Sequence, residues 1–170
     1  MRNLILQGIL QSPLSEPPPR PDDCELAQLT HAFEEASQRR LGRSLSIRAV
    51  DAGSCNGCEL EMHALGNAYY DLERFGLRFV ASPRHADVLM VTGPVTKNMR
   101  LALERAHTAM PSPKWVIAVG DCACDGGVFA GGYACVGAVS HVVPVDLRLP
   151  GCPPEPIVLL KGLIALIEAD

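Results

Sequence analysis

The sequence lacks several features that would point to common functions. It contains no run of lysine or arginine and its formal net charge is −4, so the basic surface of a nucleic-acid-binding protein is missing. No apolar stretch approaches the roughly 18 to 20 residues that cross a bilayer. No nucleophile stands in a motif with a partnered base, so hydrolase chemistry has no support. These absences predict a folded protein that binds no nucleic acid and spans no membrane.

Length and composition indicate an ordinary globular chain. With 170 residues, 48% hydrophobic and 20% charged, it is large enough to bury a core without covalent staples. The first residues, MRNLILQGILQ, resemble an export signal, but Gln7 and Gly8 interrupt the apolar run and no small-residue cleavage site follows. We therefore expect an uncleaved cytoplasmic chain. Its seven cysteines would stay reduced there and serve metal or redox chemistry.

Residues 1–43 are expected to form an extension made of a helix, a proline-rich linker and a second helix. Apolar residues near the N-terminus can line one helical face, for docking on a partner or on the core in preference to a membrane surface. Pro17, Pro18 and Pro19 form the stiff linker. After it, Asp22 or Asp23 can cap a helix that ends near Gly42. The apolar positions of that helix are Leu26, Leu29, Phe33 and Ala36.

From residue 44 onward, predicted strands and helices alternate. Short runs rich in Val, Ile and Leu predict buried strands, and these lie at 44–51, 77–82, 86–93, 114–120 and 141–150. Helical patterns occupy 59–74, 96–109 and 156–168. This alternation predicts an α/β fold for residues 44–170, a flavodoxin-like doubly wound parallel sheet with helices on both faces.

Cysteines follow the carboxyl ends of three predicted strands. Cys55 and Cys58 come after the first strand, Cys122 and Cys124 after the fourth, and Cys152 after the last. The carboxyl ends of parallel strands share one edge of an open sheet, where ligands bind. Three of these cysteines, together with either Cys122 or Cys124, can therefore meet there as four thiolates.

Four thiolates suit either a zinc ion or an iron-sulfur cluster. Zinc sites of this type commonly use two C-x-x-C pairs, whereas this sequence has one such pair and separate single cysteines. Glycines beside the thiols let backbone N–H groups approach sulfide; they are Gly53, Gly57, Gly120, Gly126, Gly127 and Gly151. The pattern favours an iron-sulfur cluster, with a zinc-stabilised structural adaptor as the alternative.

The motifs DAGSCNGCELE, GDCACDGG and VDLRLPGCPP, in this order, resemble the iron-sulfur small subunit shared by nickel-iron hydrogenases and the 20 kDa subunit of respiratory NADH dehydrogenase. The resemblance covers roughly residues 45–168. It implies one four-iron four-sulfur cluster, whose ligands by motif position are Cys55, Cys58, Cys122 and Cys152. The remaining cysteines lie outside the family's ligand positions and are expected to act as small hydrophobic residues; they are Cys24, Cys124 and Cys135.

The first motif separates the branches of this family. Its C-x-x-C form is similar to hydrogenase small subunits, whereas the NADH dehydrogenase subunit carries two adjacent cysteines. SPRHADVLMVTGPVTKNM and YYDLERFG also look like the membrane-bound, energy-converting hydrogenases, including the formate hydrogenlyase type. The resemblance implies an electron-transfer subunit with no catalytic residues of its own. Its implied partners are a nickel-iron large subunit, a ferredoxin-like iron-sulfur subunit and membrane-arm subunits, on the cytoplasmic side of the inner membrane. The alternative is the quinone-linked NADH dehydrogenase subunit.

Overall fold

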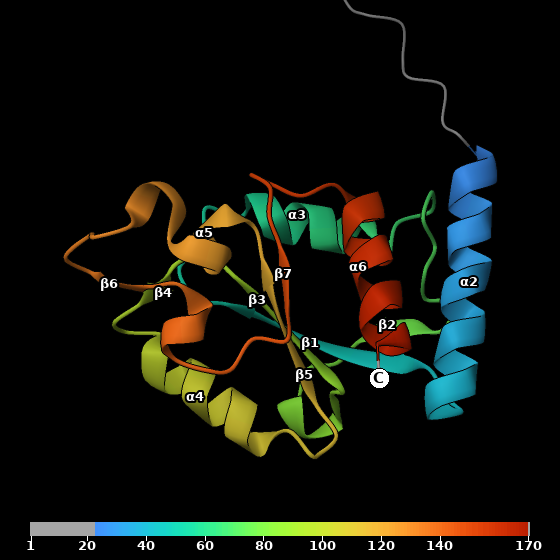
Figure 1. The fold of residues 1–170 in the computed structure, drawn as a ribbon, viewed down its shortest axis with the longest axis horizontal. Coiled ribbons are helices and arrows are strands. Elements are labelled where there is room, and N and C mark those ends of the chain that lie inside the picture. The colour runs from blue at the N-terminus through green and yellow to red at the C-terminus, as the bar shows by residue number, and fades with distance from the viewer. Residues whose placement is uncertain (1–22, 170) are drawn as a thin grey trace, which may run out of the picture.

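Five parallel strands form the central sheet of the protein (Figure 1). The computed structural model describes residues 23–169, so the first expected helix and the proline-rich linker lie outside the described residues. The strands are β1 (Leu45–Asp51), β2 (Leu77–Phe79), β3 (Val88–Thr92), β5 (Trp115–Val119) and β7 (Leu147–Leu149). Their order is β2-β1-β3-β5-β7, the order of a flavodoxin-like sheet. The predicted fold class is confirmed.

Helices cover both faces of the sheet and create two hydrophobic cores. One core lies under α2 (Asp23–Leu41), α3 (Gly57–Ala64) and α6 (Pro156–Glu168). The other lies under α4 (Arg100–Ala109) and α5 (Asp121–Asp125). Side chains alternate between the faces along each strand, so Val88 and Met90 join the first core while Leu89 and Val91 join the second. Burial on both faces explains why these strands are continuous apolar runs.

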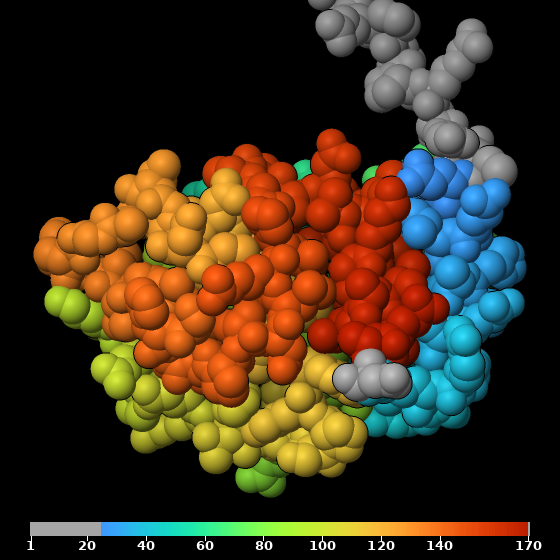
Figure 2. Space-filling model, viewed as in Figure 1, coloured from blue at the N-terminus to red at the C-terminus, as the bar shows by residue number. Residues whose placement is uncertain are grey.

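Helix α2 packs along α6, and Figure 2 shows their surfaces side by side. Phe33 is fully buried and belongs to the same core as the sheet. At the surface, Lys161 Nζ donates to Glu25 Oε1 at 2.6 Å, and Arg40 Nη1 donates to the Ile167 carbonyl at 2.8 Å. The helix expected to end near Gly42 therefore shares a core with residues 44–169, and the division at residue 43 stays a prediction.

Two helices differ in extent from the sequence prediction. The helix expected over 59–74 ends at Ala64, and turns follow. Asn67 Oδ1 accepts backbone N–H bonds from Tyr69 at 2.8 Å and Tyr70 at 2.9 Å, a side-chain turn that competes with helix. The helix expected over 96–109 begins at Arg100. Before it, β4 (Val95–Thr96) pairs antiparallel with β6 (Cys135–Gly137). Short 3₁₀ turns occupy Pro83–His85, Gly127–Phe129 and Val139–His141.

An ion pair between the half-exposed Arg43 and the buried Asp87 joins the entries of β1 and β3, at the amino edge of the sheet. Arg43 binds Asp87 through both guanidinium nitrogens, at 2.6 and 2.9 Å. Asp87 Oδ2 also accepts the backbone N–H of Ser46 at 2.9 Å. Asp87 is only 6% exposed, and its hydrogen bond raises the pKa of the Arg43 guanidinium. This pair stabilises the edge opposite the cysteines.

Candidate functional site

The loop after β1 carries the C-x-x-C motif. Asp51 ends the strand, and its Oδ1 accepts the backbone N–H groups of Gly53 and Ser54, each at 2.7 Å. Cys55 follows in the exposed part of the loop, and Cys58 lies half-buried in the first turn of α3. The carboxylate thus folds the loop back so that both thiols stand at the carboxyl edge of the sheet.

The loops after β5 and β7 are bonded to each other. The backbone N–H of Asp121 donates to the Gly151 carbonyl at 2.9 Å, and the backbone N–H of Gly151 donates to Asp121 Oδ1 at 2.7 Å. Each loop carries a cysteine, Cys122 on α5 and Cys152 directly after Gly151. Both cysteines line one cleft of about 480 Å³. The rest of its lining is Asp121, Asp125, Gly127, Val128 and Ala130.

The thiols from the three loops lie within range of one another's charge. Burial is the main cause that raises the pKa of Cys58 to about 12, followed by Glu59 and then by Cys55, Cys122 and Cys152. Burial also raises the pKa of Cys122, followed by Cys152 and Cys55. In the free chain Cys58 and Cys122 therefore hold their protons at neutral pH. Metal ligation requires thiolates, so coordination releases those protons.

Two glycines leave space beside these sulfurs. A Cβ atom on Gly120 (φ +86°) would lie 2.5 Å from Cys58 Sγ, and one on Gly127 (φ +49°) would lie 2.9 Å from Cys122 Sγ. Both distances are well below ordinary carbon–sulfur contact. Only a residue without a side chain is compatible with thiols packed this closely against the strand ends.

These donors fit an iron-sulfur cluster better than a single zinc ion. Within residues 23–169, no three His, Cys, Asp or Glu side chains converge on a point that would hold one metal ion. Tetrahedral zinc with Zn–S bonds of about 2.3 Å needs its thiolates roughly 3.8 Å apart. A four-iron cluster is a larger group and accepts more widely spaced thiolates. The space that Gly120 and Gly127 leave beside Cys58 and Cys122, next to the cleft lined by Cys122 and Cys152, is compatible with such a group.

The other cysteines occupy different surroundings. Cys124 packs against the second core, and its Sγ donates to the Ala118 carbonyl at 3.7 Å; burial is the main cause that raises its pKa. Cys135 is half-buried on β6. The side chain of Cys24 lies outside the described residues. Cys124 thus faces the core while Cys122 faces the cleft, which accords with the predicted choice between them; the ligand set itself stays a prediction.

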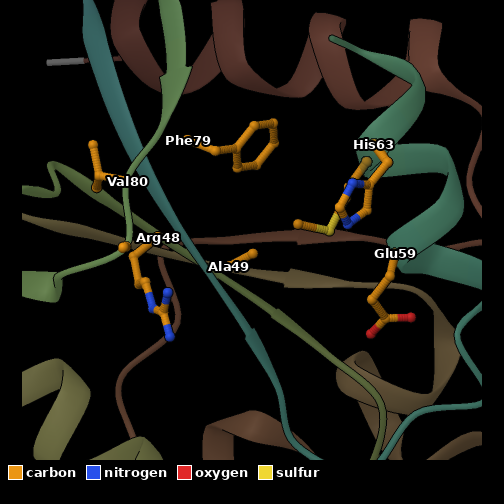
Figure 3. A pocket seen from close by; sticks show the side chains of 8 residues that line it. Arg48, Ala49, Glu59, His63, Phe79 and Val80 are labelled. Carbon is orange, nitrogen blue, oxygen red and sulfur yellow. The ribbon is translucent and has the colours of Figure 1, made fainter. Parts of the chain in front are cut away.

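Glu59, next to Cys58, connects the first cysteine loop to β3. Its Oε1 accepts hydrogen bonds from Ser54 Oγ at 2.6 Å and from Thr92 Oγ1. Among the described residues, Oε2 is buried without a partner. It borders a second hollow of about 280 Å³, where Figure 3 shows Glu59 and Arg48 on opposite sides of an apolar gap beside Phe79. The contact with Thr92 has no sequence signal, because it depends on the packing of α3 over the end of β3.

The fold and the site define a class of protein: a flavodoxin-like α/β subunit with cysteine loops gathered at the carboxyl edge of its sheet. The family described as NADH ubiquinone oxidoreductase, 20 Kd subunit, matches residues 55–166. The chain belongs to this family, which confirms the resemblance seen in the motifs.

A solved structure agrees with this assignment. It is that of the membrane-bound sulfane sulfur reductase, an archaeal respiratory membrane complex. One of its chains is 34% identical, with a TM-score of 0.66, over 81% of this chain and 74% of that one. The protein is thus homologous to subunits of membrane-bound oxidoreductase complexes. Between residues 23 and 169, no helix has both the length and the apolar character needed to cross a membrane.

Proposed function

We propose that this chain is the electron-transfer small subunit of a membrane-associated nickel-iron hydrogenase complex. Its ligands to one four-iron four-sulfur cluster are Cys55, Cys58, Cys122 and Cys152. The observation that carries the proposal is the geometry of the three cysteine loops: Cys122 and Cys152 line one cleft, their loops are bonded to each other, and Gly120, close to Cys122 in the sequence, lies against Cys58 Sγ. When bound, the cluster supplies a one-electron relay between the nickel-iron large subunit and a ferredoxin-like subunit.

The role of the chain's own residues is to hold the thiolates and limit access of water. Two of the four thiols are half-buried, and the glycines at 120 and 127 allow close packing around them. In this proposal the hydrogen chemistry takes place in the large subunit, and this chain transfers electrons to and from it.

Exposed apolar residues beside the cleft support a partner there. Val128, which lines the cleft, is 88% exposed, and nearby Phe129 and Tyr133 are 46% and 93% exposed. Figure 2 shows the segment around β6 at one end of the molecule. Exposed apolar patches of this kind mark interaction sites. We assign this surface to the large subunit, with membrane-arm subunits placing the complex on the cytoplasmic side of the inner membrane.

A second candidate is a subunit of a sulfane-sulfur-reducing membrane complex. The similarity to the archaeal reductase favours it. The quinone-linked NADH dehydrogenase subunit remains a further alternative from the family match, although the C-x-x-C motif of this chain differs from the adjacent cysteines of that branch. All of these functions use the same cluster site, so a test of the cluster ligands does not distinguish between them. A separate test of activity is needed for that.

Serine substitutions test the ligand set. Cys55→Ser, Cys58→Ser, Cys122→Ser and Cys152→Ser in the purified complex should each abolish iron and acid-labile sulfide, because each removes a thiolate bond. Cys124→Ser is the matched control and should retain both. Loss of iron and sulfide in Cys124→Ser, with both retained in Cys122→Ser, would show that Cys124 is the ligand instead of Cys122. Zinc in the unmodified complex, with no acid-labile sulfide, would instead support a zinc-stabilised structural adaptor.

Activity assays on the same complex separate the candidates. Hydrogen-dependent reduction of methyl viologen supports the hydrogenase, and it should disappear in the four ligand variants. Reduction of polysulfide without hydrogen oxidation would instead support the sulfane sulfur reductase type.

A further inference from the structure

Aspartate carboxylates accept backbone N–H groups in every cysteine loop. Asp51 binds two amides in the Cys55 loop, Asp121 binds the Gly151 amide next to Cys152, and Asp125 binds the Gly127 amide beside Cys122. The four distances are all 2.7 Å, for Gly53, Ser54, Gly127 and Gly151 as donors. Four backbone amides of the cysteine loops thus donate to carboxylates and not to sulfur.

This arrangement has two consequences for a bound cluster: fewer amides donate to its sulfurs, and negative charge lies close to it. Both disfavour the reduced state. Amide donors to sulfur and positive charge favour the reduced state, whereas nearby negative charge disfavours it. The cleft holds both aspartates, and its described lining includes no lysine or arginine.

We infer that Asp51, Asp121 and Asp125 are positioning residues that hold the cysteine loops and keep the reduction potential of the cluster low. The inference rests on the proposed function, because it requires a cluster at this site.

Three substitutions at Asp121 separate charge from hydrogen bonding. Asp121→Asn keeps an acceptor oxygen for the Gly151 amide but removes the charge. Asp121→Ala also frees the amide to bond sulfur. Asp121→Glu keeps the charge. The matched control is Asp146→Asn, because Asp146 Oδ2 accepts the Val116 amide at 2.7 Å at the opposite edge of the sheet.

Redox-titrated EPR of the purified whole complex measures the effect. Asp121→Asn should favour reduction by about tenfold, which is about 59 mV for one electron. Asp121→Ala should shift the potential further upward, Asp121→Glu should restore it, and Asp146→Asn should leave it unchanged. Asp125→Asn and Asp51→Asn, at exposed positions, should shift it in the same direction and serve where Asp121 variants do not assemble.

The possible failures are distinguishable. An unmodified complex without iron, sulfide or a cluster signal would overturn the proposed function. A normal cluster whose potential is unmoved, or lowered, in all the aspartate-to-asparagine variants would overturn only the inference about these residues.

Discussion

Replacing Gly120 with alanine should remove the cluster, because the new methyl group would occupy the space of a ligand sulfur. Gly120 has φ +86° and ψ 158°, a region that only glycine adopts readily and that costs another residue about 1–3 kcal/mol. Its Cβ would also lie 2.5 Å from Cys58 Sγ. Since carbon contacts are optimal at roughly 3.5–4.0 Å, the sulfur must move by about 1 Å. Binding sites tolerate displacements of only about 0.5 Å.

The control for this variant is Gly131→Ala. Gly131 also has a positive φ, +76°, but a Cβ there would meet nothing within 4 Å. Gly131→Ala should therefore lower the free energy of unfolding only by the strain of a positive φ, about 1–2 kcal/mol. In a chain of this size the melting temperature falls by roughly 2–4 °C per kcal/mol. Iron and sulfide content, measured beside the melting temperature, then separates strain from displacement of the sulfur.

The two variants should differ in cluster content more than in stability. Gly120→Ala should retain little iron while Gly131→Ala retains the full amount. A fully loaded Gly120→Ala complex with an unchanged EPR signal would refute the reasoning that Cys58 is held against this glycine as a ligand. Equal iron loss in both variants would show that backbone strain alone is responsible.

Three further predictions concern the scaffold, each measured by thermal unfolding of the complex. Phe33→Ala should cost about 3–5 kcal/mol because Phe33 is fully buried under α2, whereas Leu101→Ala, 53% exposed, should cost almost nothing; equal losses would refute this. Arg43→Ala should cost about 1–2 kcal/mol, because Asp87 loses its cation but keeps the Ser46 amide, and the 54% exposed Arg43 side chain is screened by water; Arg43→Lys should cost less, and an unchanged melting temperature in Arg43→Ala would contradict the argument. Burial, and then Lys114, lower the pKa of His107, so its contribution to stability is present above about pH 6.5 and is lost as the pH falls toward the lowered value. His107→Gln should weaken this loss of stability in acid, whereas His85→Gln, at an exposed position, should leave it unchanged; identical profiles of melting temperature against pH in the two variants would refute the role of His107.

The positions of β1, β3, β5 and α6 follow from local sequence pattern. Pro156 stands in the first turn of α6, a position where proline is favoured, and the apolar runs of the parallel strands are buried on both faces. The early end of α3 was not predicted: the helix stops at Ala64, just before Gly66, and the Asn67 side chain then holds the following turn.

The candidate site was predictable in its location but not in its internal bonding. The cysteines follow strand ends, so their common edge could be inferred from the topology of parallel sheets. The bond from the Gly151 amide to Asp121 depends on the register between β5 and β7, which residue spacing does not encode. The same applies to Thr92 and Glu59, whose contact joins two elements distant in the sequence.

The parallel topology also sets the order in which this protein can be assembled. Cys55 precedes most of the sheet, whereas Cys152 follows β7, the last strand. A chain still being synthesised therefore has no complete set of the proposed ligands until β7 has paired with β5, a long-range step of the slow kind. On the proposed ligand set, insertion of iron and sulfide is therefore coupled to the pairing of the last strand with the sheet.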